Sequence, residues 1–160
     1  MDLREGERTL KVYRHHFTPY LSKLFQVLLG AFPFFFLTFL FRSSISQSTY
    51  VAVHMFIFFL FALVSIYITL VYWLDKLIVT NKRVIFINWK YLTVRDESEA
   101  LLDDIQDIHT HENGFLASLN FFDYGSLKID TSSSHITIFF DNAPDPEGIR
   151  AYIYHIKGNT

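Results

Sequence analysis

The side chains of this chain that could do chemistry are scattered and form no recognisable catalytic set. His109 and His111 alternate, so they could share one face of a strand and hold a metal ion together with Glu112 or His135. No third ligand stands at a characteristic spacing. The absence of cysteine also excludes thiolate metal sites, disulfides and cysteine nucleophiles. We therefore expect neither a metal nor a cofactor.

A second group of candidate residues is acidic and lies in the C-terminal half of the chain. Its members are Glu97, Glu99, Asp103, Asp104 and Asp107. Carboxylates can act as general acids or bases, but no nucleophile, glycine-rich phosphate loop or metal motif accompanies these. A solvated acidic face is the simpler interpretation. The sequence thus predicts a protein that is not an enzyme.

Two apolar runs, Leu24 to Phe41 and Val51 to Leu74, are separated by the polar stretch Arg42 to Thr49. Helices of about 18 and 24 residues would be about 27 and 36 Å long, and the hydrocarbon core of a bilayer is about 30 Å thick. The sequence therefore predicts a transmembrane helical hairpin over residues 24–74, with spans at about 24–41 and 51–74.

His54 is an ionisable side chain inside the second apolar run, about one helical turn from the polar loop. An ionisable group at membrane depth is a candidate functional site. With Pro33, which is expected to kink the first helix, His54 could line a transport path through several associated hairpins. The alternative is that His54 serves only to pair the two helices.

Basic residues flank both ends of the predicted hairpin. Arg14 precedes it and Lys82 and Arg83 follow it, whereas the connecting loop contains Arg42 alone. The positive-inside tendency then places both termini in the cytoplasm and predicts a multi-pass protein of the cytoplasmic (inner) membrane. Residues 75–160 carry more acidic than basic side chains, which argues against nucleic acid as a partner.

The segments on the two sides of the hairpin differ in pattern. Residues 1–23 are predicted to be a cytoplasmic or interfacial segment. Its apolar residues recur at helical spacing, as in an interfacial helix, and a disordered segment is the alternative. Residues 75–160 are predicted to be a soluble domain. Their β-branched and aromatic runs predict about six or seven antiparallel strands, with a tight turn at Asn81 and Lys82 and a third strand at Tyr91 to Arg95.

The end of the chain predicts an amphipathic helix. Asp145 can cap it, Pro146 suits the first helical position, and apolar residues then recur along one face. An antiparallel β sandwich or barrel can use such a helix to close one open end. The predicted fold class is therefore a membrane-anchored α+β protein, in which a transmembrane hairpin precedes a β sandwich or barrel capped by a C-terminal helix.

Several segments carry a resemblance to a known family, and their order tells more than any one of them. They are GERTLKVYRHH (Gly6–His16), DKLIVTNKRVIFI (Asp75–Ile87), LLDDIQDI (Leu101–Ile108), NFFDYGSLKIDT (Asn120–Thr131) and NAPDPEGIRAYI (Asn142–Ile153). Together they resemble the bacterial pleckstrin-homology (PH) domain family, in its membrane-anchored type with two N-terminal transmembrane helices. The resemblance implies a PH-like fold of two antiparallel sheets and a C-terminal helix. It implies no activity, because this fold hosts many binding roles.

The resemblance also points to candidate interaction residues. Lys82 and Arg83 stand where eukaryotic PH domains place basic residues that bind inositol phosphates, and Asn81 beside them is counted with them as a possible interaction residue. The turn here is short and its surroundings are acidic, so the alternative is that Asn81 and Lys82 make the turn while Arg83 braces the domain or pairs with an acid. Phe121 and Phe122 would be a binding hot spot if exposed, and otherwise they are buried at a loop.

These features predict a non-catalytic, membrane-anchored PH-like domain that binds a protein partner or itself at the cytoplasmic membrane face. A membrane tether raises the effective concentration of such a domain and favours assembly in the membrane plane. The expected partners are the lipid bilayer and either a homo-oligomer or a membrane or cytoplasmic protein. The alternatives are a small membrane transport or channel component and a lipid head-group sensor.

Overall fold

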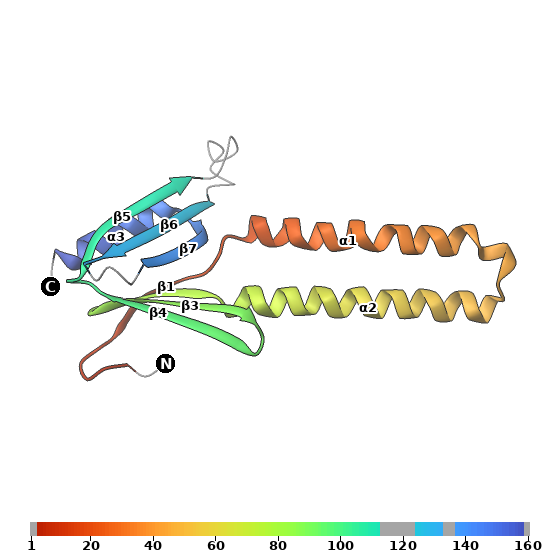
Figure 1. Ribbon diagram of the computed structural model, residues 1–160, viewed down its shortest axis with the longest axis horizontal. Coiled ribbons are helices and arrows are strands. Elements are labelled where there is room, and N and C mark those ends of the chain that lie inside the picture. Colours follow the sequence, from red (N-terminus) through yellow and green to blue (C-terminus); the bar gives the residue numbers. More distant parts are fainter. Residues whose placement is uncertain (1–2, 113–123, 133–136, 159–160) are drawn as a thin grey trace. The chain divides into compact units, whose positions relative to one another are not determined.

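The computed structural model describes residues 3–112, 124–132 and 137–158, and the chain divides into two compact units (Figure 1). One unit, the domain, consists of Met1–His16 together with Trp73–Thr160. The other unit, the hairpin, is the intervening segment Phe17–Tyr72. The domain is thus assembled from sequence on both sides of the hairpin.

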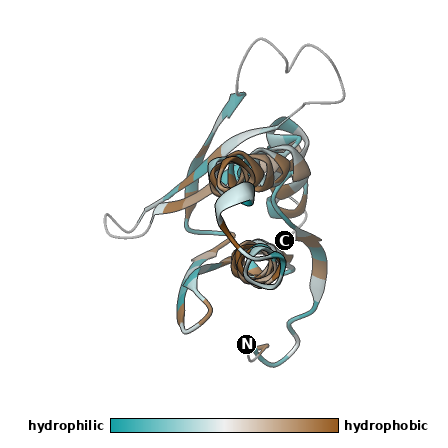
Figure 2. Cartoon of the chain, turned by 90° about the vertical axis from the view of Figure 1, so that its right-hand side faces the viewer, coloured by the Kyte–Doolittle hydropathy of each residue, from teal (hydrophilic) through white to brown (hydrophobic). Residues whose placement is uncertain are grey.

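The hairpin consists of two long helices, α1 (Phe17–Leu40) and α2 (Gln47–Leu74), joined by the short 3-10 helix η1 (Arg42–Ser44). Both helices are long and apolar enough to cross a membrane, judged by length and composition. Most of the residues along them are hydrophobic (Figure 2). Each helix begins earlier than the sequence predicts, α1 at Phe17 and α2 at Gln47. Pro19 lies in the first turn of α1, where a missing backbone donor costs little.

Seven strands and one helix form the described part of the domain. The strands are β1 (Thr9–Tyr13), β2 (Lys76–Thr80), β3 (Arg83–Tyr91), β4 (Val94–Leu101), β5 (Ile105–Glu112), β6 (Tyr124–Thr131) and β7 (Thr137–Pro144), and the helix is α3 (Pro146–Lys157). The first four strands form one antiparallel sheet in the order β1-β2-β3-β4, and the last three form a second in the order β5-β6-β7. This arrangement confirms the predicted antiparallel sheets with a C-terminal helix.

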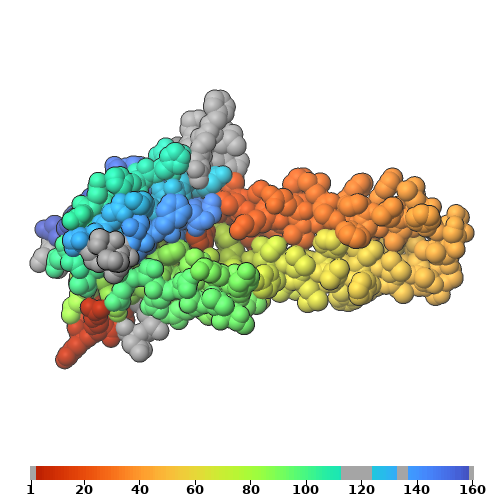
Figure 3. Space-filling view, in the orientation of Figure 1, coloured from red at the N-terminus to blue at the C-terminus, as the bar shows by residue number. Residues whose placement is uncertain are grey.

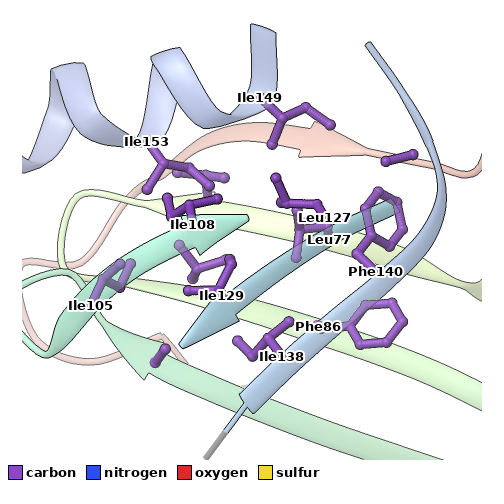
Figure 4. Packing of buried hydrophobic residues seen from close by; sticks show 14 of the residues in the cluster. Leu77, Phe86, Ile105, Ile108, Leu127, Ile129, Ile138, Phe140, Ile149 and Ile153 are labelled. Carbon is purple, nitrogen blue, oxygen red and sulfur yellow. The ribbon is translucent and has the colours of Figure 1, made fainter. Parts of the chain in front are cut away.

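The core lies where the inward faces of the two sheets and α3 meet. Alternation along the strands selects the buried side chains, so Leu127 and Ile129 of β6 are buried while Lys128 between them is exposed. Ile149 and Ile153 of α3 join the same cluster, as Figure 4 shows. The predicted apolar face of the C-terminal helix therefore completes the core.

The start of α3 follows the predicted capping pattern. The Asp145 side chain accepts a hydrogen bond from the Gly148 N–H at 2.8 Å, and Pro146 occupies the first turn. A Cβ atom at Gly148 would lie 2.1 Å from a carboxylate oxygen of Asp145. Glycine is therefore the residue that leaves room for this capping carboxylate.

The expected helical pattern at the N-terminus is wrong for residues 9–13, which form strand β1. This strand pairs with β2 in antiparallel register, with Thr9 opposite Thr80 and Tyr13 opposite Leu77. A helix this short is marginal on its own, whereas pairing with β2 satisfies the backbone along a sheet edge. The predicted boundaries at residues 23 and 75 are corrected accordingly, because the domain takes up residues as far as His16 and resumes at Trp73.

The predicted third strand at Tyr91 to Arg95 is also wrong, because the chain reverses inside it. β3 continues through Trp89 to Tyr91, and Tyr91 pairs with Val94 across the turn at Leu92 and Thr93. β4 then runs on through the charged residues that follow. It is an edge strand of its sheet, where charged side chains remain in water and discourage pairing with other chains.

Candidate functional site

The turn between β2 and β3 is organised by the Thr80 hydroxyl. This oxygen accepts hydrogen bonds from the backbone N–H groups of Lys82 at 3.2 Å and Arg83 at 3.0 Å. The hydroxyl also lies within donating distance of two acceptors, a carboxylate oxygen of Glu7 at 2.8 Å and the Arg83 carbonyl at 2.9 Å. The sequence predicts the tight turn at Asn81 and Lys82, but it gives no sign of the acid beside it.

The N-terminal segment of the domain, Arg4–Arg8, lies against this turn (Figure 3). The Asn81 side chain accepts from the Arg8 N–H at 2.8 Å and donates to the Gly6 carbonyl at 3.2 Å. The Lys82 ammonium donates to the Glu5 carbonyl at 2.7 Å. Two of the candidate interaction residues therefore hold the N-terminal segment in place.

The third candidate, Arg83, is a buried side chain at the centre of an ionic network that extends to the surface. Its Nε and Nη2 atoms donate to the two carboxylate oxygens of Glu7 at 2.9 and 3.0 Å, a bidentate pairing. Its Nη1 atom donates to Glu99, which also pairs with Arg4 at 2.8 Å. The side chain of Glu7 is 0% exposed and that of Arg83 is 8% exposed. We call these four residues the Glu7–Arg83 network.

The electrostatics of the network favour its ionised form. Hydrogen bonds from Arg83 lower the pKa of Glu7 from 4.5 to about 2, against the opposing effect of burial. The same hydrogen bonds raise the pKa of Arg83. Because Arg83 faces two carboxylates, the geometry favours the alternative in which it pairs with an acid over the binding of a lipid phosphate.

Acid should therefore weaken the domain through Glu7. The folded-state pKa of about 2 lies below the ordinary value of 4.5, so the stabilisation is complete above about pH 4.5 and is lost as the pH falls from there toward 2. We expect the urea midpoint, followed by tryptophan fluorescence in detergent micelles, to fall more between about pH 6, above this window, and about pH 3, inside it, in the natural chain than in the Glu7→Gln variant. Equal falls would contradict the assignment.

His54 connects the two helices of the hairpin. Its Nδ1 atom lies 3.0 Å from the Tyr50 carbonyl one turn earlier, and its Nε2 atom lies 3.4 Å from the Thr38 hydroxyl of α1. Its ring also packs against Phe35 and Tyr50. These contacts favour a role in helix pairing over a role in a transport path.

The remaining chemical candidates are not brought together. His109 lies 3.5 Å from Asp107 and 3.7 Å from Asp130, both of them acids on the surface. Among the residues that the structure describes, no group of three histidine or acidic side chains could hold a metal ion. His135, Phe121 and Phe122 lie outside the described residues.

A second polar cluster occupies the end of the domain where the chain leaves for the hairpin and returns from it. The His15 side chain lies 2.6 Å from the Asp141 carbonyl and 3.4 Å from an Asp75 carboxylate oxygen. The other oxygen of Asp75 accepts from the Trp89 N–H at 2.6 Å. The Arg14 guanidinium lies 4.9 Å from the ring centre of Trp73. We call this part of the domain the junction end.

The junction end shows what the sequence interpretation missed. The His15 side chain is only 6% exposed, and it links the end of β1 to Asp75, just before β2, and to Asp141 of β7. Asp75 holds the backbone of β3 through its hydrogen bond with the Trp89 N–H. The signal for both was weak, because their partners lie more than a dozen residues away along the chain.

Two comparisons with known proteins found a match. A family model described as "Bacterial PH domain" matches residues 60–154, which begins within α2 and leaves β1 and α1 outside the match. A solved structure of a DUF1696 family protein with a pleckstrin-homology domain from Shewanella loihica PV-4 is similar at 18% identity and a TM-score of 0.40. The match covers 52% of this chain and 70% of that chain. No curated protein matches.

Proposed function

Because the chain belongs to the bacterial PH domain family, we propose that it is a non-catalytic, membrane-anchored PH domain that binds a protein partner at the cytoplasmic membrane face. The partner proposed first is another copy of the same chain. The domain would act as an assembly module, and the hairpin would hold it at the membrane where other copies are concentrated.

The observation that carries this proposal is the insertion of the hairpin between two neighbouring strands. β1 precedes α1, β2 follows α2, and the two strands pair with each other in one sheet. A single membrane crossing between them would leave β1 and β2 on opposite sides of the bilayer. Two crossings return the chain to the side from which it started, so this fold supports a two-span anchor with the whole domain on one side.

The excess of basic residues at the two outer ends of the hairpin then supports a cytoplasmic domain. Two covalent connections also limit how freely the domain can turn. Arg14–His16 joins β1 to α1, and Asp75 alone joins α2 to β2. A domain with such short connections presents its surface to neighbours in the membrane plane within a narrow range of orientations, which favours association there.

A binding role, as opposed to a catalytic one, is supported by the pairing of the buried ionisable side chains with one another. Glu7 is held by Arg83, and His15 is close to Asp75. These pairs stabilise contacts between distant parts of the chain. Groups committed in this way are poor general acids, bases or nucleophiles, because proton transfer would break the pairs on which the fold depends.

The proposal is tested by the mass of the intact protein in nanodiscs, measured by light scattering over a range of protein-to-lipid ratios. We expect a defined oligomer whose mass does not change with the loading ratio. The matched control is a set of discs of a second, larger diameter, because the number of protein copies trapped by chance in one disc would rise with the size of the disc. A strictly monomeric protein in both sets would overturn self-assembly as the function.

A further inference from the structure

The turn that joins β3 to β4 exposes apolar and aromatic side chains together. Tyr91 is 60% exposed, Leu92 is 38% exposed and Val94 is 43% exposed. Trp89, just before them, packs on Ile78, Ile85 and Ile87, which form a small buried cluster apart from the main core. We call residues 89–95 the β3–β4 tip. Its base is fixed by packing, and its end offers apolar surface to the surroundings.

The β3–β4 tip projects from the junction end of the domain. In the antiparallel pairing of β2 with β3, Lys76 at the start of β2 lies opposite Ile87. β3 continues four residues farther, which extends the tip about 13 Å beyond that pair at about 3.3 Å per residue. The hydrogen bond from the Trp89 N–H to Asp75 ties this overhang to the point where the chain returns from α2.

The charges on the β3–β4 tip are neutralised locally. The Lys90 ammonium lies 2.7 Å from a carboxylate oxygen of Asp96. The Arg95 guanidinium pairs with Glu97 on the same strand. Close to the connection with α1, Arg14 stacks on Trp73, which is itself 65% exposed. The exposed surface of this end therefore combines aromatic and aliphatic side chains with charged ones, and the cations named here are paired with acids or a ring.

Such a surface matches the interface of a lipid bilayer. Tyrosine and tryptophan are enriched there because their rings enter the apolar zone while their polar atoms remain among the head groups. Because the nearby charges are paired, the surface favours neutral and anionic lipids about equally. The position of this surface also favours the membrane over a soluble partner. It lies at the end of the domain that carries both covalent connections to the hairpin, and a soluble partner could bind at any other end.

We propose that the β3–β4 tip inserts Tyr91, Leu92 and Val94 into the interface of the membrane that the hairpin spans. The inference rests on the proposed function, because it takes the hairpin to be a membrane anchor. The tip is then a third point of attachment, beside the connections at residues 14–16 and 75. A third point would narrow further the range of orientations that the two short connections already limit.

The test uses single-cysteine variants, which the absence of natural cysteine makes simple. Val94→Cys places an environment-sensitive fluorophore (NBD) on the tip. The matched control is Leu101→Cys, at the other end of the same strand, because Leu101 is 39% exposed and Val94 is 43% exposed. Phe59→Cys places the label near the middle of α2 as a control for the anchor. The labelled proteins are reconstituted in phosphatidylcholine vesicles with and without a doxyl-labelled lipid quencher.

The expected result is quenching at position 94 at least about twofold stronger than at position 101, together with a blue-shifted emission, as for a group at the membrane interface. Quenching at position 59 but equal, weak quenching at positions 94 and 101 would overturn the insertion of the tip and leave the membrane anchor intact. Absence of quenching at position 59 would overturn the membrane anchor itself.

Anionic lipid provides the second readout. When phosphatidylglycerol replaces part of the phosphatidylcholine, we expect the quenching at position 94 to stay unchanged, because Lys90 and Arg95 are paired with acids. Quenching that appears only with the anionic lipid and disappears at high salt would overturn the proposed apolar insertion. It would indicate binding through charge instead.

Discussion

Replacing Arg83 with methionine should destabilise the domain by about 3 kcal/mol, because breaking a buried ion pair leaves a buried charge without its partner. The charge in question belongs to Glu7, which would keep the Arg4 N–H and the Thr80 hydroxyl but lose both guanidinium bonds. The measurement is urea unfolding of the intact protein in detergent micelles. Tryptophan fluorescence reports on the domain through Trp89 in β3, and on its connection to the hairpin through Trp73 in the last turn of α2.

A matched control separates the loss of this buried ion pair from the general effect of removing a positively charged side chain. Lys128→Met removes an exposed ammonium that lies 2.8 Å from Asp130, and such surface pairs contribute less than about 1 kcal/mol. The double variant Glu7→Gln with Arg83→Met should recover part of the lost stability, because it removes the buried charge. If Arg83→Met shifts the midpoint no more than Lys128→Met does, the network is not structural.

The network also changes how a lipid-binding test must be designed. Replacing Lys82 and Arg83 together with glutamate looks from the sequence like a direct test of head-group binding. In the structure, glutamate at position 83 would face Glu7 and Glu99, so the variant would lose stability whether or not lipid binds. Lys82→Glu alone is the informative change, because the Lys82 ammonium donates to the Glu5 backbone carbonyl and its replacement does not break the pairing of Arg83 with Glu7.

Joining residues 1–16 to residues 73–160 through a short glycine-serine linker should give a soluble, folded domain, whereas residues 73–160 alone should not fold. In the longer chain β1 still pairs with β2, and the linker only replaces the hairpin between two paired strands. In the shorter chain β2 becomes an unprotected edge and Arg83 loses Glu7. A cooperative thermal transition followed by circular dichroism distinguishes the two outcomes.

The matched control for this experiment keeps the composition and changes the order of residues. A joined chain in which residues 4–13 are scrambled has the same length, charge and linker, but it cannot place Glu7 and the β1 register together. It should behave like residues 73–160 alone. A cooperative transition at the same temperature in all three chains would show that the N-terminal segment does not belong to the domain.

Local signals made part of the fold predictable. The long apolar runs predict α1 and α2, and the cap at Asp145 with Pro146 predicts α3, because each pattern lies within a few turns of the chain. The alternation along β6 likewise predicts which of its side chains are buried. The reversal at Leu92 and Thr93 escaped prediction because neither glycine nor proline marks it.

The remaining features depend on contacts between distant parts of the sequence. Five residues of β1 fit a helical and a strand pattern about equally, and their partner strand lies beyond the whole hairpin. An acidic partner for Arg83 was one of the alternatives for the candidate site, but Glu7 could be selected only once β1 was placed beside β2. The pairing of β1 with β2 in the folded domain determines both the strand conformation of β1 and the acid that pairs with Arg83, and residue type alone does not determine either.

The insertion of the hairpin between β1 and β2 makes the folding of the domain depend on membrane insertion. During synthesis β1 emerges first and has no partner until both spans and then β2 have followed it. If one span failed to cross, β1 and Glu7 would stay across the bilayer from the rest of the domain, and the first sheet would lack its edge strand and Arg83 its partner. Such a protein would expose apolar surface and be a substrate for cellular proteases. Pairing of β1 with β2 thus completes the first sheet only in chains that have crossed the membrane twice, and it thereby separates correctly inserted chains from the others.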